Sequence, residues 1–299
     1  MPVIDLYIPD CEGESLAECL NRDWNTFDNL DIVVANELLS IILDDKELSK
    51  RKYKTNFSHS LAHRNDWCSF KNELKYKNRF IIHKSLKKHF DSLEELFEKN
   101  FCLQNLPNEL YRARINPNTA PISSSKMGKP PNDLASGGRA NPLGISYLYT
   151  ATTPETAIHE IRPHVNDNVT VAKFSFVCNI NNIIDLRHPR KILFQYSPFA
   201  LDEDDLELRC SYLEYLDIIG EELSKPILPR EAQLEYLPTQ YLCEFIKHHK
   251  FSGIAYKSSI DQSTNSGFNI VFFDDSNLKI DNTTQYIVNS TQVKIKQIG

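Results

Sequence analysis

The chain has 299 residues, of which 41% are hydrophobic and 10% aromatic, and its formal net charge is −6. This composition can form a packed core, and the acidic balance gives no overall case for a nucleic-acid partner. The apolar runs are too short to cross a bilayer, the first residues lack the pattern of a signal peptide, and the seven cysteines show no CxxC spacing, so we expect a cytoplasmic protein without a disulfide framework or membrane span.

Residues 1–105 show mainly helical patterning. Apolar residues recur at helical spacing in FDNLDIVVANELLSIILDD, residues 27–45, and in SLKKHFDSLEELFEKN, residues 85–100. Between these segments, His59 and His63 have the spacing of a metal-binding pair, but the glutamate of an HExxH motif and a third ligand are missing from the sequence around them. We therefore predict a helical N-terminal domain over residues 1–105 and no metal site.

From Tyr111 onward, short β-branched and aromatic runs alternate with helical segments, which predicts an α+β domain over residues 106–299. We expect strands at residues 110–115, 145–150, 169–176, 181–186, 253–257 and 268–273. We expect helices at residues 154–162, 203–223 and 231–249. The segment 116–144 is rich in proline and glycine, and a long irregular segment of this kind is typical of a ligand-facing loop.

The most informative segment is GGRANPLGISYLYTATTPETAIHEIRP, residues 137–163. Its glycines allow the backbone to approach a ligand closely, and the run ISYLYT has the pattern of a strand. Thr153 is suited to capping a helix and Pro154 to its first position, which places Glu160 near the second turn of a short helix. The segment therefore predicts a small-residue loop, a strand ending near Tyr149, and an acid on the following helix.

This segment resembles the RES family, which is named for its Arg, Glu and Ser. Four further motifs follow the family's order: YRAR at 111–114, VTVAKFSF at 169–176, GIAYKSS at 253–259 and FNIVFF at 268–273. The resemblance covers residues 108–280. Trp67 and Phe70, in a W-x-x-F pattern, also resemble a helical domain found ahead of some RES domains.

The family consists of NAD-degrading toxins of the toxin–antitoxin type, with a mixed-sheet fold related to that of ADP-ribosyltransferases. By resemblance, Arg112, Tyr149, Glu160 and Ser258 occupy the catalytic positions. The resemblance also implies that NAD is bound by Arg112 and Tyr149 together with Arg114, Arg139 and Asn269. NAD is then the substrate, and no separate cofactor is expected.

The resemblance implies cleavage of the nicotinamide–ribose bond of NAD, in which positive charge develops on the ribose. Glu160 would face this charge, and Arg112 would bind pyrophosphate oxygens through its planar fork of donors. Tyr149 would stack on the nicotinamide or orient the ribose, and Ser258 would hydrogen-bond to the substrate. Arg139, which follows the glycine pair, would be a second phosphate contact.

Several alternatives remain open at this point. Water, inorganic phosphate or a macromolecule could accept the ADP-ribose, and the last of these would make the protein an ADP-ribosyltransferase. A catalytically silent NAD-binding module is a third class. Arg79 and His83 are the nearest match to the Arg–His pair of HEPN-type helical RNases, but their spacing is too short for that type. Candidate partners are an antitoxin or inhibitor protein and a second copy of the chain.

Overall fold

The computed structural model describes residues 4, 7–24, 26–27, 30–55, 58–81, 102–103, 105–180, 182–189, 216–258 and 267–290. The chain divides into two compact units, one of residues 1–69 with 188–218 and one of residues 70–187 with 219–299. The predicted helix at 85–100 and the first part of that at 203–223 lie outside the described residues, whereas residues 216–224 are helical.

The first unit combines helices with a two-stranded antiparallel sheet of β1 (Tyr7–Glu14) and β2 (Tyr53–Thr55). Its other elements are α1 (Leu16–Trp24), α2 (Ile32–Ile42), the 3-10 turn η2 (Leu48–Lys50) and the start of α3 (Ser58–Tyr76). Asp31 caps α2 by accepting a hydrogen bond from the amide of Val33. The prediction of a helical region missed the sheet, because β1 contains Pro9 and Gly13 and is a strand only through its pairing with β2.

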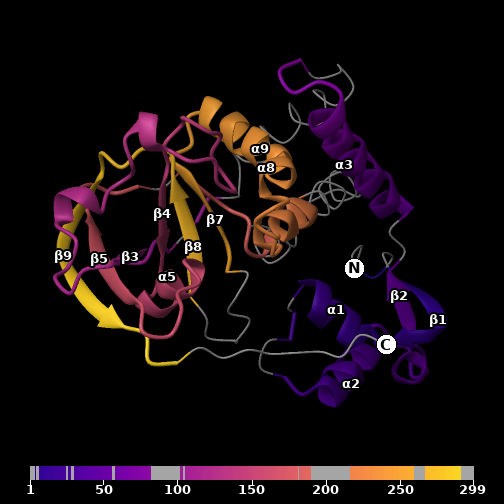
Figure 1. The fold of residues 1–299 in the computed structure, drawn as a ribbon. Coiled ribbons are helices and arrows are strands. Elements are labelled where there is room, and N and C mark those ends of the chain that lie inside the picture. Colours follow the sequence, from indigo (N-terminus) through magenta and orange to yellow (C-terminus); the bar gives the residue numbers. More distant parts are fainter. Residues whose placement is uncertain are drawn as a thin grey trace. The chain divides into compact units, whose positions relative to one another are not determined.

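The second unit is built on a seven-stranded mixed sheet, in the order β6-β7-β8-β4-β3-β5-β9 (Figure 1). The strands are β3 (Leu110–Ile115), β4 (Leu148–Ala151), β5 (Asn168–Phe176), β6 (Ile183–Asp185), β7 (Gly253–Lys257), β8 (Phe268–Phe272) and β9 (Leu278–Ile287). All neighbours are antiparallel except β6 and β7. This sheet confirms the predicted α+β class, and each of the six predicted strands is present with shifts at some ends.

The strand β9 was not predicted. Its sequence, LKIDNTTQYI, is polar in the middle and only partly buried, so its periodicity is weak. It is a strand because it pairs along its whole length with β5, from Asn168 opposite Ile287 to Phe176 opposite Leu278. Long-range pairing of this kind overrides local propensity.

Helices of the second unit pack on the sheet and on one another. They are α5 (Pro154–Glu160), α8 (Ala232–Glu235) and α9 (Leu237–His248), with short turns η3 (Ser124–Lys126) and η4 (Asn132–Leu134). The predicted single helix at 231–249 is interrupted at Tyr236, directly before the first turn of α9 that contains Pro238. The last turns of α3 pack here as well, because the Phe70 ring meets Tyr241 edge-on at 5.5 Å and Lys75 Nζ pairs with Glu235 Oε2 at 2.6 Å.

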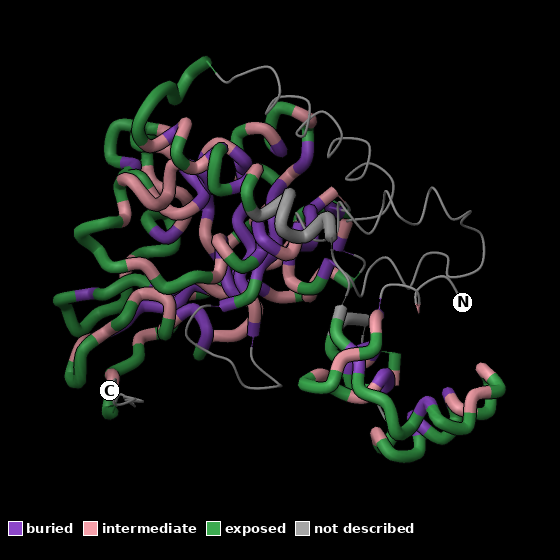
Figure 2. The backbone as a smooth tube through the Cα atoms, turned by 90° about the vertical axis from the view of Figure 1, so that its right-hand side faces the viewer, coloured by how far each residue is buried: buried purple, intermediate pink, exposed green. Residues whose placement is uncertain are grey.

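Alternation along the strands gives the sheet two apolar faces, which carry two separate buried clusters. Figure 2 colours the backbone by burial, with the buried residues in purple. Leu110, Phe174 and Phe272 belong to one buried cluster, which also includes Met127 from the loop 116–144. Ala113, Ala151 and Val171 belong to another, which packs against Ala157 of α5. This packing fixes α5, and with it Glu160, against the sheet.

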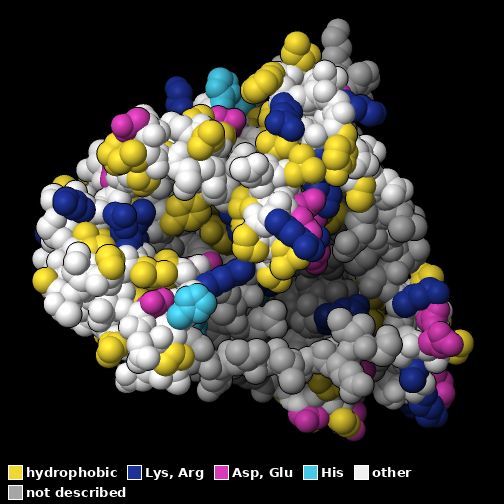
Figure 3. All heavy atoms as spheres, viewed as in Figure 1, with side chains coloured by type: hydrophobic (Ala, Val, Ile, Leu, Met, Phe, Trp, Pro, Cys, Tyr) yellow, Lys and Arg dark blue, Asp and Glu magenta, His cyan; other side chains and the backbone are white. Residues whose placement is uncertain are grey.

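The predicted domain boundary near residue 105 stays a prediction, although every strand of the large sheet begins after residue 109. Within the described part of the chain, no helix is both long and apolar enough to span a membrane. On the face drawn in Figure 3, basic and acidic side chains are interspersed rather than gathered by sign.

Candidate active site

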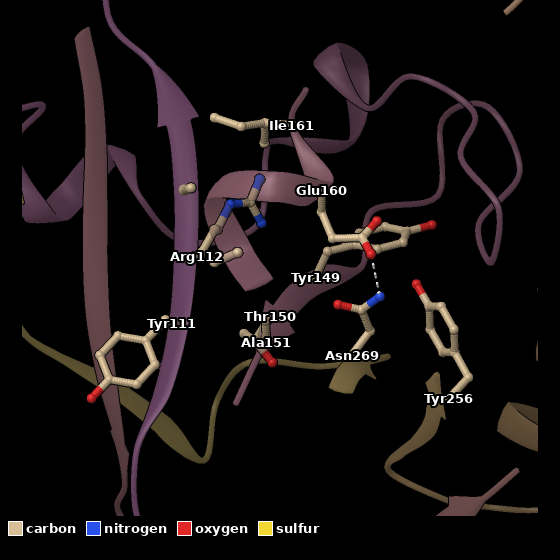
Figure 4. A pocket seen from close by; sticks show the side chains of 11 residues that line it. Tyr111, Arg112, Tyr149, Thr150, Ala151, Glu160, Ile161, Tyr256 and Asn269 are labelled. Carbon is tan, nitrogen blue, oxygen red and sulfur yellow. Dashed lines mark hydrogen bonds between the residues drawn. The ribbon is translucent and has the colours of Figure 1, made fainter. Parts of the chain in front are cut away.

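A cavity of about 160 Å³ lies beside α5, where the middle of the large sheet is loosely joined. Strands β3 and β4 are paired through only Tyr111 and Ala151. The cavity is lined by Tyr111, Arg112, Ala113, Tyr149, Thr150, Ala151, Ala157, Glu160, Ile161, Tyr256 and Asn269. Figure 4 shows Tyr149, Glu160, Tyr256 and Asn269 close together, from β4, α5, β7 and β8, with Arg112 of β3 beside them. The ring of Tyr111 points away from this group (Figure 4).

Glu160 is held by two hydrogen bonds to the same carboxylate oxygen. Ser258 Oγ donates to its Oε1 at 2.6 Å and Asn269 Nδ2 donates to its Oε1 at 2.8 Å (Figure 4 draws the second). The helix that carries Glu160 begins as predicted, with the Thr153 hydroxyl accepting from the amide of Thr156 at 3.1 Å. Oε2 has no hydrogen-bond partner among the described residues. The carboxylate is thus fixed in orientation and keeps one oxygen for a ligand.

Arg112 lines the same cavity from β3. Its Nη1 atom is buried without a hydrogen-bond partner, and the structure as described contains no ion pair to its guanidinium. Burial, and to a lesser extent the charge of Arg114, lower the pKa of Arg112 to about 10. A buried nitrogen of a cationic group without a partner is costly, so this position is suited to an anionic ligand.

The hydroxyl of Tyr149 is engaged by the glycine-rich loop. It accepts a hydrogen bond from the amide of Ala140 at 2.9 Å and donates one to Asn141 Oδ1 at 2.7 Å. The side-chain nitrogen of Asn141 in turn donates to the carbonyls of Ser136, Pro142 and Ile145. Tyr149 therefore presents its ring, rather than a spare hydroxyl, to the cavity.

Helix α9 anchors the same loop. Gln240 Nε2 donates to the carbonyl of Gly138 at 2.8 Å, and Thr239 Oγ1 donates to the carbonyl of Arg139 at 2.6 Å. These contacts place α9 against the loop that binds Tyr149. They connect α9 through the loop to the ring of Tyr149.

The two other arginines are placed differently from Arg112. Arg139 Nη1 donates to the carbonyls of Lys225 at 2.6 Å and Glu222 at 3.3 Å, at the end of the helical residues 216–224. Arg114 Nη1 donates to the carbonyl of Lys126 at 2.8 Å. Neither lines the cavity. Their predicted contacts with NAD phosphates stay predictions, and the geometry gives Arg139 a structural task at a helix end.

We predict that Gly138→Ala destabilises the protein by about 1–3 kcal/mol, whereas Gly137→Ala is tolerated. A Cβ at Gly138 would lie 2.6 Å from both Asn141 Oδ1 and the Tyr149 hydroxyl, which hold each other in place. A Cβ at Gly137 would meet its nearest atom at 3.5 Å, an ordinary contact. Urea unfolding of both variants checks this, and equal stability of the two would contradict it.

The model of the RES domain family matches residues 109–289. The chain belongs to the RES domain family. No curated protein matches it. Among solved structures, it is similar to a chain of the M. tuberculosis MbcT–MbcA toxin–antitoxin complex, with 12% sequence identity and a TM-score of 0.37, over 69% of this chain and 93% of that one.

Within the RES domain, the structure brings together Arg112, Tyr149, Glu160, Ser258 and Asn269, five of the seven residues predicted for the site. Sequence reasoning missed Asn141 and Tyr256. Tyr256 stands two positions before Ser258 in GIAYKSS, and strand alternation alone could have placed the two on one side. The residues that the structure describes contain no group of three or more His, Cys, Asp or Glu side chains that could hold a metal ion.

Proposed function

We propose that the RES domain of this chain cleaves the nicotinamide–ribose bond of NAD, with water or phosphate as the acceptor, and acts as a toxin that depletes cellular NAD. The observation that carries this proposal is the pairing, around one cavity, of an arginine with a buried, unpartnered nitrogen and a carboxylate that the described residues hold through only one of its oxygens. NAD matches both groups, because it carries an anionic pyrophosphate and a ribose that becomes cationic as nicotinamide leaves.

The reaction needs electrostatic stabilisation more than covalent chemistry. Nicotinamide departs neutral from its cationic form, and the ribose carbon takes on oxocarbenium character in the transition state. Glu160 would place its negative charge beside that carbon. Ser258 and Asn269 already hold the carboxylate, so little reorganisation is required when the charge develops.

The proposed role of Ser258 follows from the same geometry. Its hydroxyl donates to Glu160, but Ser258 is buried and does not line the cavity, whereas a nucleophilic serine requires an open approach to the substrate. We therefore assign Ser258 to positioning the carboxylate. Arg112 would bind the pyrophosphate, and the ring of Tyr149 would stack on the nicotinamide.

The test is purified protein incubated with NAD, with and without inorganic phosphate, and the products identified by mass. Release of nicotinamide with ADP-ribose indicates hydrolysis, and release with a phosphorylated ADP-ribose indicates phosphorolysis. ADP-ribose attached to a protein or nucleic acid would instead make the chain a transferase related to the ADP-ribosyltransferases. Unchanged NAD under all conditions would contradict the proposal and leave a silent binding module. An antitoxin or inhibitor protein is the partner that a toxin of this kind requires.

A further inference from the structure

Tyr256 lies next to the residues that hold Glu160. It belongs to β7, and in the antiparallel pairing of β7 with β8 it stands directly opposite Asn269, whose amide donates to the carboxylate. Its side chain lines the cavity and its exposed fraction is only 5%. In the view of Figure 4, its hydroxyl points towards Glu160 and Asn269.

The Tyr256 hydroxyl has no hydrogen-bond partner among the described residues. Some polar atoms are fully buried and have no partner, such as the hydroxyl oxygen of Tyr147. The hydroxyl oxygen of Tyr256 is not one of these fully buried atoms. Because Tyr256 lines the cavity, its hydroxyl is placed to form a hydrogen bond with a bound ligand. Tyr149 is different, because the loop amide of Ala140 and the side chain of Asn141 already occupy its hydroxyl.

The Tyr256 hydroxyl also keeps its proton. Burial, and then the negative charge of Glu160, raise the pKa of Tyr256 well above its ordinary value. A neutral phenol beside a carboxylate can donate one hydrogen bond and accept another. The sugar of a nucleotide, with its ring oxygen and hydroxyl groups, is the part of NAD that matches this pairing.

Resting on the proposed function, we infer that Tyr256 is a further substrate-contacting residue, whose hydroxyl hydrogen-bonds to a hydroxyl group of the ribose that Glu160 faces. The two tyrosines of the cavity then have separate tasks: Tyr149 offers an aromatic face, and Tyr256 offers a polar contact. No bond is made or broken by Tyr256. It orients the sugar so that the carbon losing nicotinamide lies beside the carboxylate.

The test uses Tyr256→Phe, which removes only the hydroxyl, with Tyr147→Phe as the matched control. Neither hydroxyl has a hydrogen-bond partner among the described residues, but Tyr147 does not line the cavity. We expect Tyr256→Phe to lower kcat/KM for nicotinamide release about tenfold or more, the loss of one hydrogen bond to substrate in a buried site. Tyr147→Phe should match the wild type, and thermal unfolding should show both variants folded with an unchanged or higher Tm.

A second measurement separates a substrate contact from an indirect effect. NAD analogues lacking the 2-hydroxyl or the 3-hydroxyl of the nicotinamide ribose are assayed with the wild type and Tyr256→Phe. The wild type should lose activity with one of them, and the variant should lose far less with that same analogue, because the contact is already absent. If, for both analogues, the loss caused by the missing hydroxyl were as large in Tyr256→Phe as in the wild type, the proposed contact would be overturned.

The outcomes distinguish this inference from the function on which it rests. A wild-type protein that leaves NAD unchanged removes the proposed function and this inference with it. An active wild type together with an equally active Tyr256→Phe removes only the role of Tyr256. Equal losses of activity in Tyr256→Phe and Tyr147→Phe would also overturn the role of Tyr256. Removing either buried hydroxyl would then be enough to lower activity, whether or not it lines the cavity.

Discussion

Glu160→Gln is expected to lower the rate of nicotinamide release from NAD by on the order of 100-fold or more, the loss typical of removing one preorganised electrostatic group. The amide oxygen of glutamine can take the place of Oε1 and accept the hydrogen bonds of Ser258 and Asn269. The amide nitrogen then replaces Oε2, so that the positive end of a dipole faces the developing cation. The fold should be kept while the transition state loses its counter-charge.

The measurement is steady-state nicotinamide release with circular dichroism as the fold control. Glu155→Gln is a matched variant, because Glu155 is an exposed acid on the same helix and does not line the cavity. It should release nicotinamide at the wild-type rate. A folded Glu160→Gln protein with wild-type activity would disprove the proposed mechanism.

Arg112→Met is expected to abolish detectable NAD binding and, at the same time, to stabilise the unliganded protein. Arg112 is a half-buried cation whose Nη1 atom is buried without a partner, and replacing it with an apolar side chain of similar length removes the cost of burying that charge. A gain of about 1 kcal/mol would raise the Tm by about 2–4 °C in a protein of this size. If Arg112 were instead retained for packing, Arg112→Met would lower the Tm.

Calorimetric titration with NAD and thermal unfolding without ligand check both halves of this prediction. Arg112→Lys keeps a charge but loses the bidentate fork, so we expect weakened rather than abolished binding and no gain in stability. Lys279→Met, on the exposed part of β9, should change neither quantity. A destabilised Arg112→Met protein that still binds NAD tightly would show that Arg112 is structural.

The sequence was sufficient to predict those features whose signal lies in a few neighbouring residues. Strand alternation predicted residues 110–115, 169–176 and 253–257, and the Thr153–Pro154 pair predicted the start of the helix that presents Glu160. The order of the motifs predicted which strands carry the site, and the family match over residues 109–289 confirmed the resemblance on which that prediction depended. Each of these features depends on a few neighbouring residues.

Only the tertiary structure decided which groups are occupied and which remain for a ligand. Ser258 and Asn269 reach Glu160 across 98 and 109 positions of sequence, and the carbonyls that bind Arg139 lie more than 80 positions away. The pairing of β9 with β5 and the spare hydroxyl of Tyr256 are likewise set by the packing of distant segments. A residue type shows what a side chain can donate or accept, but whether that capacity is already used depends on the neighbours that folding brings to it.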